Sequence, residues 1–386
     1  MIAVLIVNLA CIALVLLAYP LYCRWQARKP LLPWPEYQNW PSLSVLIVVR
    51  NGEDMIVDKL INTLELSYPG PKPEIWVYSD GSKDRTVALA QQFKEVQVID
   101  SHHHHGKIFG LNTLALRAKG EILVFSDTDA LLAKDALQSL IRPLADASIG
   151  GVCGQRQIQG KGSLNLVQRN YVSWDSIIKQ GESKKGSLTS NDGKLYALRH
   201  QLFQPIPPAV TDDLYNTLNI VSQGYRFVFA PDAVARVPAP ITELAREIPR
   251  RRRVVSASLN GLYIQRTLLN PFRFGGYAWQ LLINKIARRL LPVNLLLLLL
   301  FSALAAPGSS LAFTCLLMQL AGYGFMLLPA GLIPPPLRRW HRRCQYLLFG
   351  NIGMLMGWLD MISGQAADKW EPQKDTSHKR SEETEK

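Results

Sequence analysis

The sequence lacks the patterns that mark several common protein classes. Its 386 residues include five cysteines, and four of these, Cys11, Cys23, Cys315 and Cys344, lie in or beside long apolar runs. They form neither a disulfide framework nor a zinc-ligand spacing, so they do not decide the redox compartment. The chain has no internal repeat, and its only low-complexity segment is the charged tail after Asp368. A cysteine-stapled module and a repeat array are therefore excluded.

Charged residues are absent from residues 1–22, an apolar run close to the length of about 20 residues that crosses a bilayer. A cleaved signal peptide is the alternative, but the run has no basic start and no small-x-small site before Arg24, Arg28 and Lys29. We therefore expect a retained anchor. Because these basic residues follow the run, the positive-inside rule predicts that the next domain is cytoplasmic.

Further apolar runs lie near the other end of the chain. Residues 290–306 and 310–333 are expected to span the membrane, and arginines flank the pair on both sides, so both flanks are predicted to be cytoplasmic. Residues 346–363 could span, re-enter or lie on the surface. The net charge of +13 could indicate nucleic acid, but the basic residues cluster beside the apolar runs. Anionic membrane lipids are therefore the expected partner, with no nucleic acid.

Between the apolar ends, predicted strands and helices alternate, which is typical of an α/β domain whose parallel sheet is covered on both faces. The predicted strands are residues 43–49, 74–78, 96–99, 122–125 and 226–230. The predicted helices are residues 55–66, 85–93, 131–140, 164–181, 214–223 and 241–266, with one more that begins at Lys107. Ligands of such sheets bind at the carboxyl ends of the strands.

The run ILVF at residues 122–125 ends on two carboxylates one residue apart, Asp127 and Asp129. Where a strand turns into a loop, two such side chains can converge on one point, and hard oxygen ligands suit Mg²⁺ or Mn²⁺. Such an ion takes further ligands from substrate phosphates, so a diphosphate is the expected co-ligand. The alternative is a polar turn that caps the helix predicted at residues 131–140.

Two more residues follow strands or begin helices in the same part of the chain. Asp80, after the strand at residues 74–78, could accept hydrogen bonds from a base or a ribose, or could be an ordinary turn aspartate. Lys107 begins a helix, where its charge and the free backbone N–H groups favour phosphate; the alternative is a solvated lysine. The histidines at residues 102–105 are not expected to bind one metal ion, because consecutive side chains cannot all face it.

Six motifs in this order resemble the membrane-bound members of glycosyltransferase family 2, such as the poly-N-acetylglucosamine, cellulose and hyaluronan synthases. They are RNGED, SDGSKDRT, GKIFGLNTL, SDTDA, DGKLYALR and TDDLYNTL, and the resemblance covers residues 42–290. It implies a GT-A (Rossmann-like, mostly parallel) domain that transfers a sugar with inversion from a UDP-sugar, of the UDP-GlcNAc or UDP-glucose type. The implied acceptor is a polysaccharide or a lipid-linked glycan in envelope or exopolysaccharide synthesis, with partner subunits as a further possibility.

The resemblance also implies roles for particular residues. Asp80 matches the aspartate at the uracil and ribose, although Ser79 stands where many relatives have another aspartate. Lys107 matches a lysine near the diphosphate, and Asp127 and Asp129 match the pair that binds the metal ion and the diphosphate.

Asp213 matches the last acidic residue of the family's T-E-D motif, which is the general base. An inverting transfer needs one carboxylate to take the proton of the acceptor hydroxyl. The alternative is that Thr211, Asp212 and Asp213 only cap the following helix. At the level of the whole protein, the alternatives are a catalytically inactive sugar-nucleotide-binding scaffold and a transporter.

The chain departs from its relatives at the Q-x-x-R-W motif of processive synthases, where it has Pro249 followed by four arginines. Arg250 and Arg253 are the expected cations for the diphosphate, although arginines on such a helix could also only snorkel to lipid headgroups. The stacking tryptophan is missing, and Trp279 is the residue that could replace it. We therefore expect the protein to add one or a few sugars to its acceptor.

These expectations divide the chain into six parts. They are an N-terminal transmembrane helix (1–23), a membrane-proximal linker (24–41), the GT-A domain (42–240), amphipathic interface helices (241–289), a C-terminal transmembrane region (290–363) and a charged tail (364–386).

Overall fold

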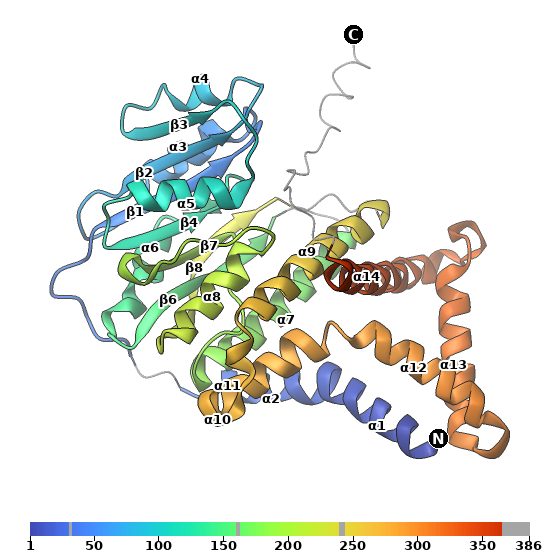
Figure 1. The fold of residues 1–386 in the computed structure, drawn as a ribbon. Coiled ribbons are helices and arrows are strands. Elements are labelled where there is room, and N and C mark those ends of the chain that lie inside the picture. The colour runs from blue at the N-terminus through green and yellow to red at the C-terminus, as the bar shows by residue number, and fades with distance from the viewer. Residues whose placement is uncertain (31–32, 160–162, 239–243, 365–386) are drawn as a thin grey trace, which may run out of the picture.

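The computed structural model describes residues 1–30, 33–159, 163–238 and 244–364. In this part of the chain, eight strands form one sheet in the order β3-β2-β1-β4-β7-β6-β8-β5, and it lies on the side opposite the long apolar helices (Figure 1). The strands are β1 (Leu43–Val49), β2 (Glu74–Asp80), β3 (Val96–Ser101), β4 (Ile122–Ser126), β5 (Leu131–Leu132), β6 (Ile149–Ile158), β7 (Leu195–Arg199) and β8 (Arg226–Val237).

The first four strands form the parallel half of the sheet. β1 pairs with β2 and with β4, and β2 pairs with β3, all in parallel. Every residue of β1 is buried: Val45 and Ile47 belong to the apolar core on one face, and Leu46 and Val48 to the core on the other. A strand covered on both faces has no polar positions to alternate with, which explains its continuous apolar sequence. These four predicted strands are confirmed, and their carboxyl ends meet at one edge.

The second half of the sheet is mixed. β7 lies between β4 and β6 and is antiparallel to both, whereas β8 is parallel to β6 and antiparallel to β5. The predicted helix at residues 131–140 is wrong at its start, because Leu131 and Leu132 pair with Arg236 and Ala235 as a short strand. The helix that follows, α6, covers only Ala136–Ile141. Pairing with a distant strand therefore overrides the local preference.

Helices cover both faces of the sheet (Figure 1). Besides α6, the helices of this domain are α3 (Ile56–Leu64), α4 (Thr86–Ala90), α5 (Lys107–Arg117), α7 (Ser163–Lys185) and α8 (Asp212–Ser222). α5 packs on β1 and β2, where Gly110 permits the close approach: a Cβ atom there would lie 2.7 Å from the Tyr78 ring and 3.0 Å from Val48. This packing fixes the start of α5 beside the carboxyl ends of β1 and β2.

Three helical segments are long and apolar enough to cross a membrane: Ile2–Ala27, Leu291–Gly308 and Ser310–Leu327. The first comprises α1 (Ile2–Ala13), a π-helical turn and α2 (Tyr19–Ala27); the others correspond to α12 (Leu291–Ala305) and α13 (Ser310–Leu327). In Figure 1, α1, α12 and α13 gather away from the sheet. The expected span at residues 310–333 is thus shorter in the structure.

The last helix, α14 (Arg338–Ser363), packs along α9 (Leu244–Ile264), and α10 (Pro271–Phe274) and α11 (Gly276–Leu281) lie between α9 and α12 in the chain. Glycines make the contact close: a Cβ atom at Gly353 would lie 2.7 Å from the Arg251 Cβ atom and 2.8 Å from the Ile248 carbonyl oxygen. Asp360 on α14 accepts two hydrogen bonds from Arg252 on α9, at 2.5 and 2.6 Å. α14 therefore packs against the helix that carries the arginine cluster.

Candidate active site

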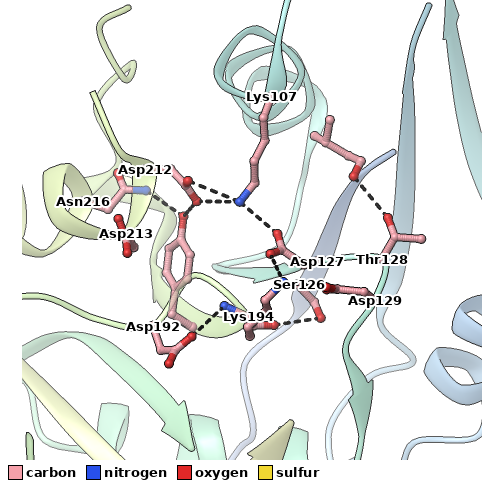
Figure 2. A network of polar contacts seen from close by, with 12 residues as sticks. Lys107, Ser126, Asp127, Thr128, Asp129, Asp192, Lys194, Asp212, Asp213 and Asn216 are labelled. Carbon is pink, nitrogen blue, oxygen red and sulfur yellow. Dashed lines mark hydrogen bonds and ion pairs between the residues drawn. The ribbon is translucent and has the colours of Figure 1, made fainter. Parts of the chain in front are cut away.

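The two aspartates after β4 meet at a single ammonium group. Lys194 Nζ lies 3.0 Å from Asp127 Oδ2 and 2.7 Å from both carboxylate oxygens of Asp129 (Figure 2). Lys194 reaches them because it directly precedes β7, whose first residue, Leu195, pairs with Ser126 at the end of β4. The structure thus brings the two carboxylates to one point, as the strand-to-loop geometry predicts.

Lys107 extends this cluster toward α8. From the first residue of α5, its Nζ atom lies 2.9 Å from Asp127 Oδ1 and 3.1 Å from Asp212 Oδ2. Burial alone would lower the pKa of Lys107, but Asp127 and Asp212 raise it above its usual range. Burial alone would raise the pKa of Asp127, and Lys107 and Lys194 hold it below its usual range. The charges alternate, so both lysines stay protonated and Asp127 stays ionised at neutral pH.

α8 begins with two aspartates in different surroundings. Asp212 accepts a hydrogen bond from the Tyr196 hydroxyl at 3.2 Å, and its burial raises its pKa in spite of Lys107. Asp213 is partly buried beside it, and its Oδ1 accepts only the neighbouring Leu214 N–H among the hydrogen bonds found in the described residues. A Cβ atom on Gly193 would lie 3.7 Å from the Asp213 Cβ atom. The predicted base therefore lies at the edge of the cluster (Figure 2).

A buried lysine that the sequence analysis missed supports the loop after β4. Lys59 on α3 is fully buried and donates hydrogen bonds to the Ser126 hydroxyl at 2.7 Å and to the Ala130 carbonyl at 2.6 Å. Burial lowers the pKa of Lys59 to about 7. Because its partners bracket residues 127–129, Lys59 positions the loop that carries the aspartates. Its burial could have been predicted from its place on the apolar stripe of α3, where it lies with Ile56 and Leu60.

Asp80 lies at the end of β2 but is fully buried. Its carboxylate accepts hydrogen bonds from the backbone N–H groups of His105 and Gly106 at 2.7 and 2.9 Å, and lies 2.7 Å from His104 Nδ1. Asp80 thus organises the histidine loop that leads into α5. Its predicted contact with a base and ribose stays a prediction.

The arginines of α9 have diverse partners. Arg250 and Arg251 donate to Glu247 of the same helix, at 2.7 and 2.6 Å, and Arg252 donates to Asp360. Arg253 is partly buried and has no ion-pair partner in the part of the chain that the structure describes. Burial lowers its pKa, and the charge of Arg250 adds to this. Of the two predicted diphosphate ligands, Arg250 is therefore engaged in an ion pair and Arg253 is not.

The donor set after β4 fits a small divalent cation. No group of three or more His, Cys, Asp and Glu side chains within the described ranges could hold a metal ion. Asp127 and Asp129 nevertheless converge on one positive charge, the ammonium of Lys194, which stands in for such an ion. Two carboxylates with the remaining ligands from substrate phosphates are a common way to bind Mg²⁺.

A solved structure shares this architecture along almost the whole chain. The mannosyltransferase PcManGT from Pyrobaculum calidifontis, in complex with GDP-Man and Mn²⁺, superposes with a TM-score of 0.67 at 23% identity, covering 94% of this chain and 99% of that one. The fold is therefore that of the GT-A glycosyltransferases, which confirms the predicted fold class. Residues 44–205 match the family model described as Glycosyl transferase family 2. The chain thus shares a domain with glycosyltransferase family 2 over less than half of its length.

Curated relatives point the same way. The poly-beta-1,6-N-acetyl-D-glucosamine synthase of Staphylococcus aureus (strain MSSA476) is 27% identical over 211 residues, 52% of this chain and 51% of that protein. Its counterpart from Staphylococcus epidermidis (strain RP62A) is 25% identical over 224 residues, 55% of this chain and 54% of that protein. This chain thus spans about half the length of the curated relatives that it matches.

Proposed function

We propose that this chain is a membrane enzyme that transfers a sugar, with inversion, from a UDP-sugar of the UDP-GlcNAc or UDP-glucose type. The acceptor would be a polysaccharide or a lipid-linked glycan. The observation that carries the proposal is the cluster of Asp127, Asp129, Lys107 and Asp213 at the carboxyl edge of the sheet, where α/β proteins bind ligands. An inactive scaffold would not need a general base such as Asp213 beside the groups that bind the diphosphate.

In this mechanism each residue acts on a different part of the reaction. Asp213 takes the proton of the acceptor hydroxyl as that oxygen attacks the anomeric carbon, and the bond from that carbon to the diphosphate breaks. Lys107 and Arg253 neutralise the charge that develops on the leaving nucleoside diphosphate. Asp127 and Asp129 would hold Mg²⁺ or Mn²⁺, which supplies further positive charge there when bound.

The apolar helices favour a membrane location for this reaction. We propose that residues 30–289 face the cytoplasm, where nucleotide sugars are made, and that residues 306–309 lie outside. Basic residues next to the apolar runs support this orientation. Cysteine-accessibility labelling of intact cells tests it: a label reaching the loop at residues 81–84 from outside would reverse the topology.

Release of the nucleoside diphosphate from a panel of sugar donors tests the activity. The panel contains UDP-GlcNAc, UDP-glucose and GDP-mannose, since the mannosyltransferase with the same fold was solved with GDP-Man and Mn²⁺. We expect UDP release that stops in EDTA and that Asp127→Asn or Asp129→Asn lowers at least about 100-fold. Full turnover in EDTA would contradict the metal requirement. No turnover of any donor by a folded protein would favour the scaffold.

We further propose that the enzyme adds one or a few sugars. The arginines at residues 250–253 leave no aromatic platform at the position of the Q-x-x-R-W motif, and aromatic contact area is a large part of sugar binding. Trp279 on α11 is 56% exposed and could supply such a ring. A long homopolymer made by the purified protein alone contradicts the proposal, and a Trp279→Ala variant that shortens such a polymer identifies the replacement ring.

A further inference from the structure

Lys194 differs from the other lysines of the site in where its charge lies. Its ammonium contacts both aspartates of the D-x-D motif and no other acidic residue in the described ranges, whereas Lys107 bridges Asp127 to Asp212 on α8. Lys59 reaches the same loop only through a hydroxyl and a carbonyl oxygen. Lys194 is therefore the lysine that holds the two prospective metal ligands together.

A divalent cation and this ammonium cannot lie between the same oxygens. Mg²⁺ sits about 2.0–2.1 Å from its oxygen ligands, which would place it in the space that Lys194 Nζ fills at 2.7–3.0 Å from Asp127 and Asp129. The two positive charges would also repel each other at this distance. Binding of the ion at both carboxylates therefore requires that the Lys194 side chain moves out.

The backbone of Lys194 is held while its side chain keeps access to solvent. Its carbonyl accepts the Ser126 hydroxyl at 3.3 Å, its N–H donates to Asp192 Oδ1 at 3.3 Å, and β7 begins at the next residue. The side chain of Lys194 is 24% exposed, and that of Lys107 is 16% exposed. A lysine stem has four rotatable bonds, so the ammonium can swing toward solvent without a change in the sheet.

We propose that Lys194 is a tethered counter-ion that competes with the divalent cation for Asp127 and Asp129 and so sets the metal concentration at which the donor site is loaded. The inference rests on the proposed function, because it takes these two aspartates as the metal ligands. In the absence of metal, the ammonium keeps the two carboxylates neutralised and oriented. The ion then binds by exchange with a charge that the protein already supplies.

Titration of the purified full chain with Mn²⁺, followed by the electron paramagnetic resonance signal of the free ion, measures this competition directly. We expect Lys194→Met to bind Mn²⁺ at least about tenfold more tightly than the wild type, because the competing charge is gone. Lys194→Arg, which keeps the charge, should stay close to the wild type. Lys119→Met is the matched control: it removes an exposed lysine that precedes β4, at the end of the strand opposite the aspartates.

The outcomes separate this inference from the proposed function. Equal Mn²⁺ affinity of the wild type and Lys194→Met overturns the competition, whether or not the enzyme turns over its donor. Tighter binding by Lys194→Met that persists when Asp127→Asn is added overturns it too, because the ion then binds elsewhere. Absence of Mn²⁺ binding in every variant, with UDP present, also overturns it. The assay of UDP release decides independently whether the chain is a transferase.

Discussion

The two cationic regions of the molecule, the lysines beside the sheet and the arginines of α9, have similar charge but different partners. Lys107 and Lys194 contact aspartates that follow β4 or begin α8, and these elements meet at the carboxyl edge of the sheet. Most of the arginines contact acidic residues of α9 and α14, as Arg252 does with Asp360. The first set of ion pairs lies at the carboxyl edge of the sheet, and in the second set the pair of Arg252 with Asp360 joins two helices.

The two regions differ in how far the carboxylates that pair with the cations are exposed to solvent. Asp127 and Asp129 beside the lysines are 24% and 33% exposed, so an incoming ion or phosphate can reach them. The carboxylates that pair with the arginines, on Glu247 and Asp360, are only 6–9% exposed. Arg253 is the arginine of this cluster without an ion-pair partner in the described residues. It therefore tests whether the arginines of α9 also contribute to donor binding.

The largest effect is expected at Asp213, which decides whether the lysine region is catalytic. Asp213→Asn should transfer the sugar about 10²- to 10⁴-fold more slowly, because an amide cannot take the proton of the acceptor. Binding of the UDP-sugar, measured by calorimetry, should change little, since the base acts only in the chemical step. If donor binding is lost and the rate at saturating donor is normal, Asp213 is a binding residue.

Next in size is a change that tests the structural role of the arginine region. Gly353→Ala should lower the free energy of unfolding by about 1–3 kcal/mol, because its Cβ atom meets Arg251 and the Ile248 carbonyl at less than 3.0 Å. Gly350→Ala is the matched control: it gains the same helix propensity, and its Cβ atom lies 3.9 Å from Arg251. Thermal unfolding in detergent measures both variants. Equal melting temperatures would show that α14 is not held closely on α9.

Substitutions of the neighbouring residues Arg252 and Arg253 separate a structural role from a role in donor binding. Arg253→Met should raise the KM for the UDP-sugar about tenfold, because it removes one cation from the diphosphate, while Arg252→Met should leave that KM unchanged. Arg252→Met should instead lower the melting temperature by a few degrees, since it breaks the pair with Asp360. Steady-state kinetics and thermal unfolding of both variants separate the two roles. The same change in KM for both would contradict this division.

A pH dependence of stability is expected from Lys59. Its pKa is lowered from 10.5 to about 7 by burial, so between these values the unfolded chain binds a proton that the folded chain has released. The contribution of Lys59 to stability therefore rises with pH between about 7 and 10, and is constant below pH 7. The melting temperature of the wild type relative to Lys59→Met should rise by a few degrees from pH 7 to pH 9. A difference that is flat or falls would contradict the lowered pKa.

Strands β1, β2 and β4 of the parallel half could be predicted from the sequence because a strand buried on both faces is a mostly apolar run. The segment DGKLYALR was recognised as a motif, but its strand, β7, was not predicted, since its pairing with β4 and β6 depends on residues more than 40 positions away. The convergence of Asp127 and Asp129 followed from local geometry. Lys194 could not be assigned in this way, because a lysine in a turn is usually solvated, and the burial of Lys59 was indicated only by its place on the apolar stripe of α3.

The contact between α9 and α14 also has a consequence for how the chain is made. Arg252 and Asp360 are 108 residues apart, and the ribosome adds about 5–20 residues per second, so the arginine is synthesised roughly 5–20 s before its partner. During that interval α12 and α13 emerge, while the glycine face of α14 does not yet exist. The strands of the sheet and its aspartates are therefore synthesised first, and the contact between α9 and α14 forms last.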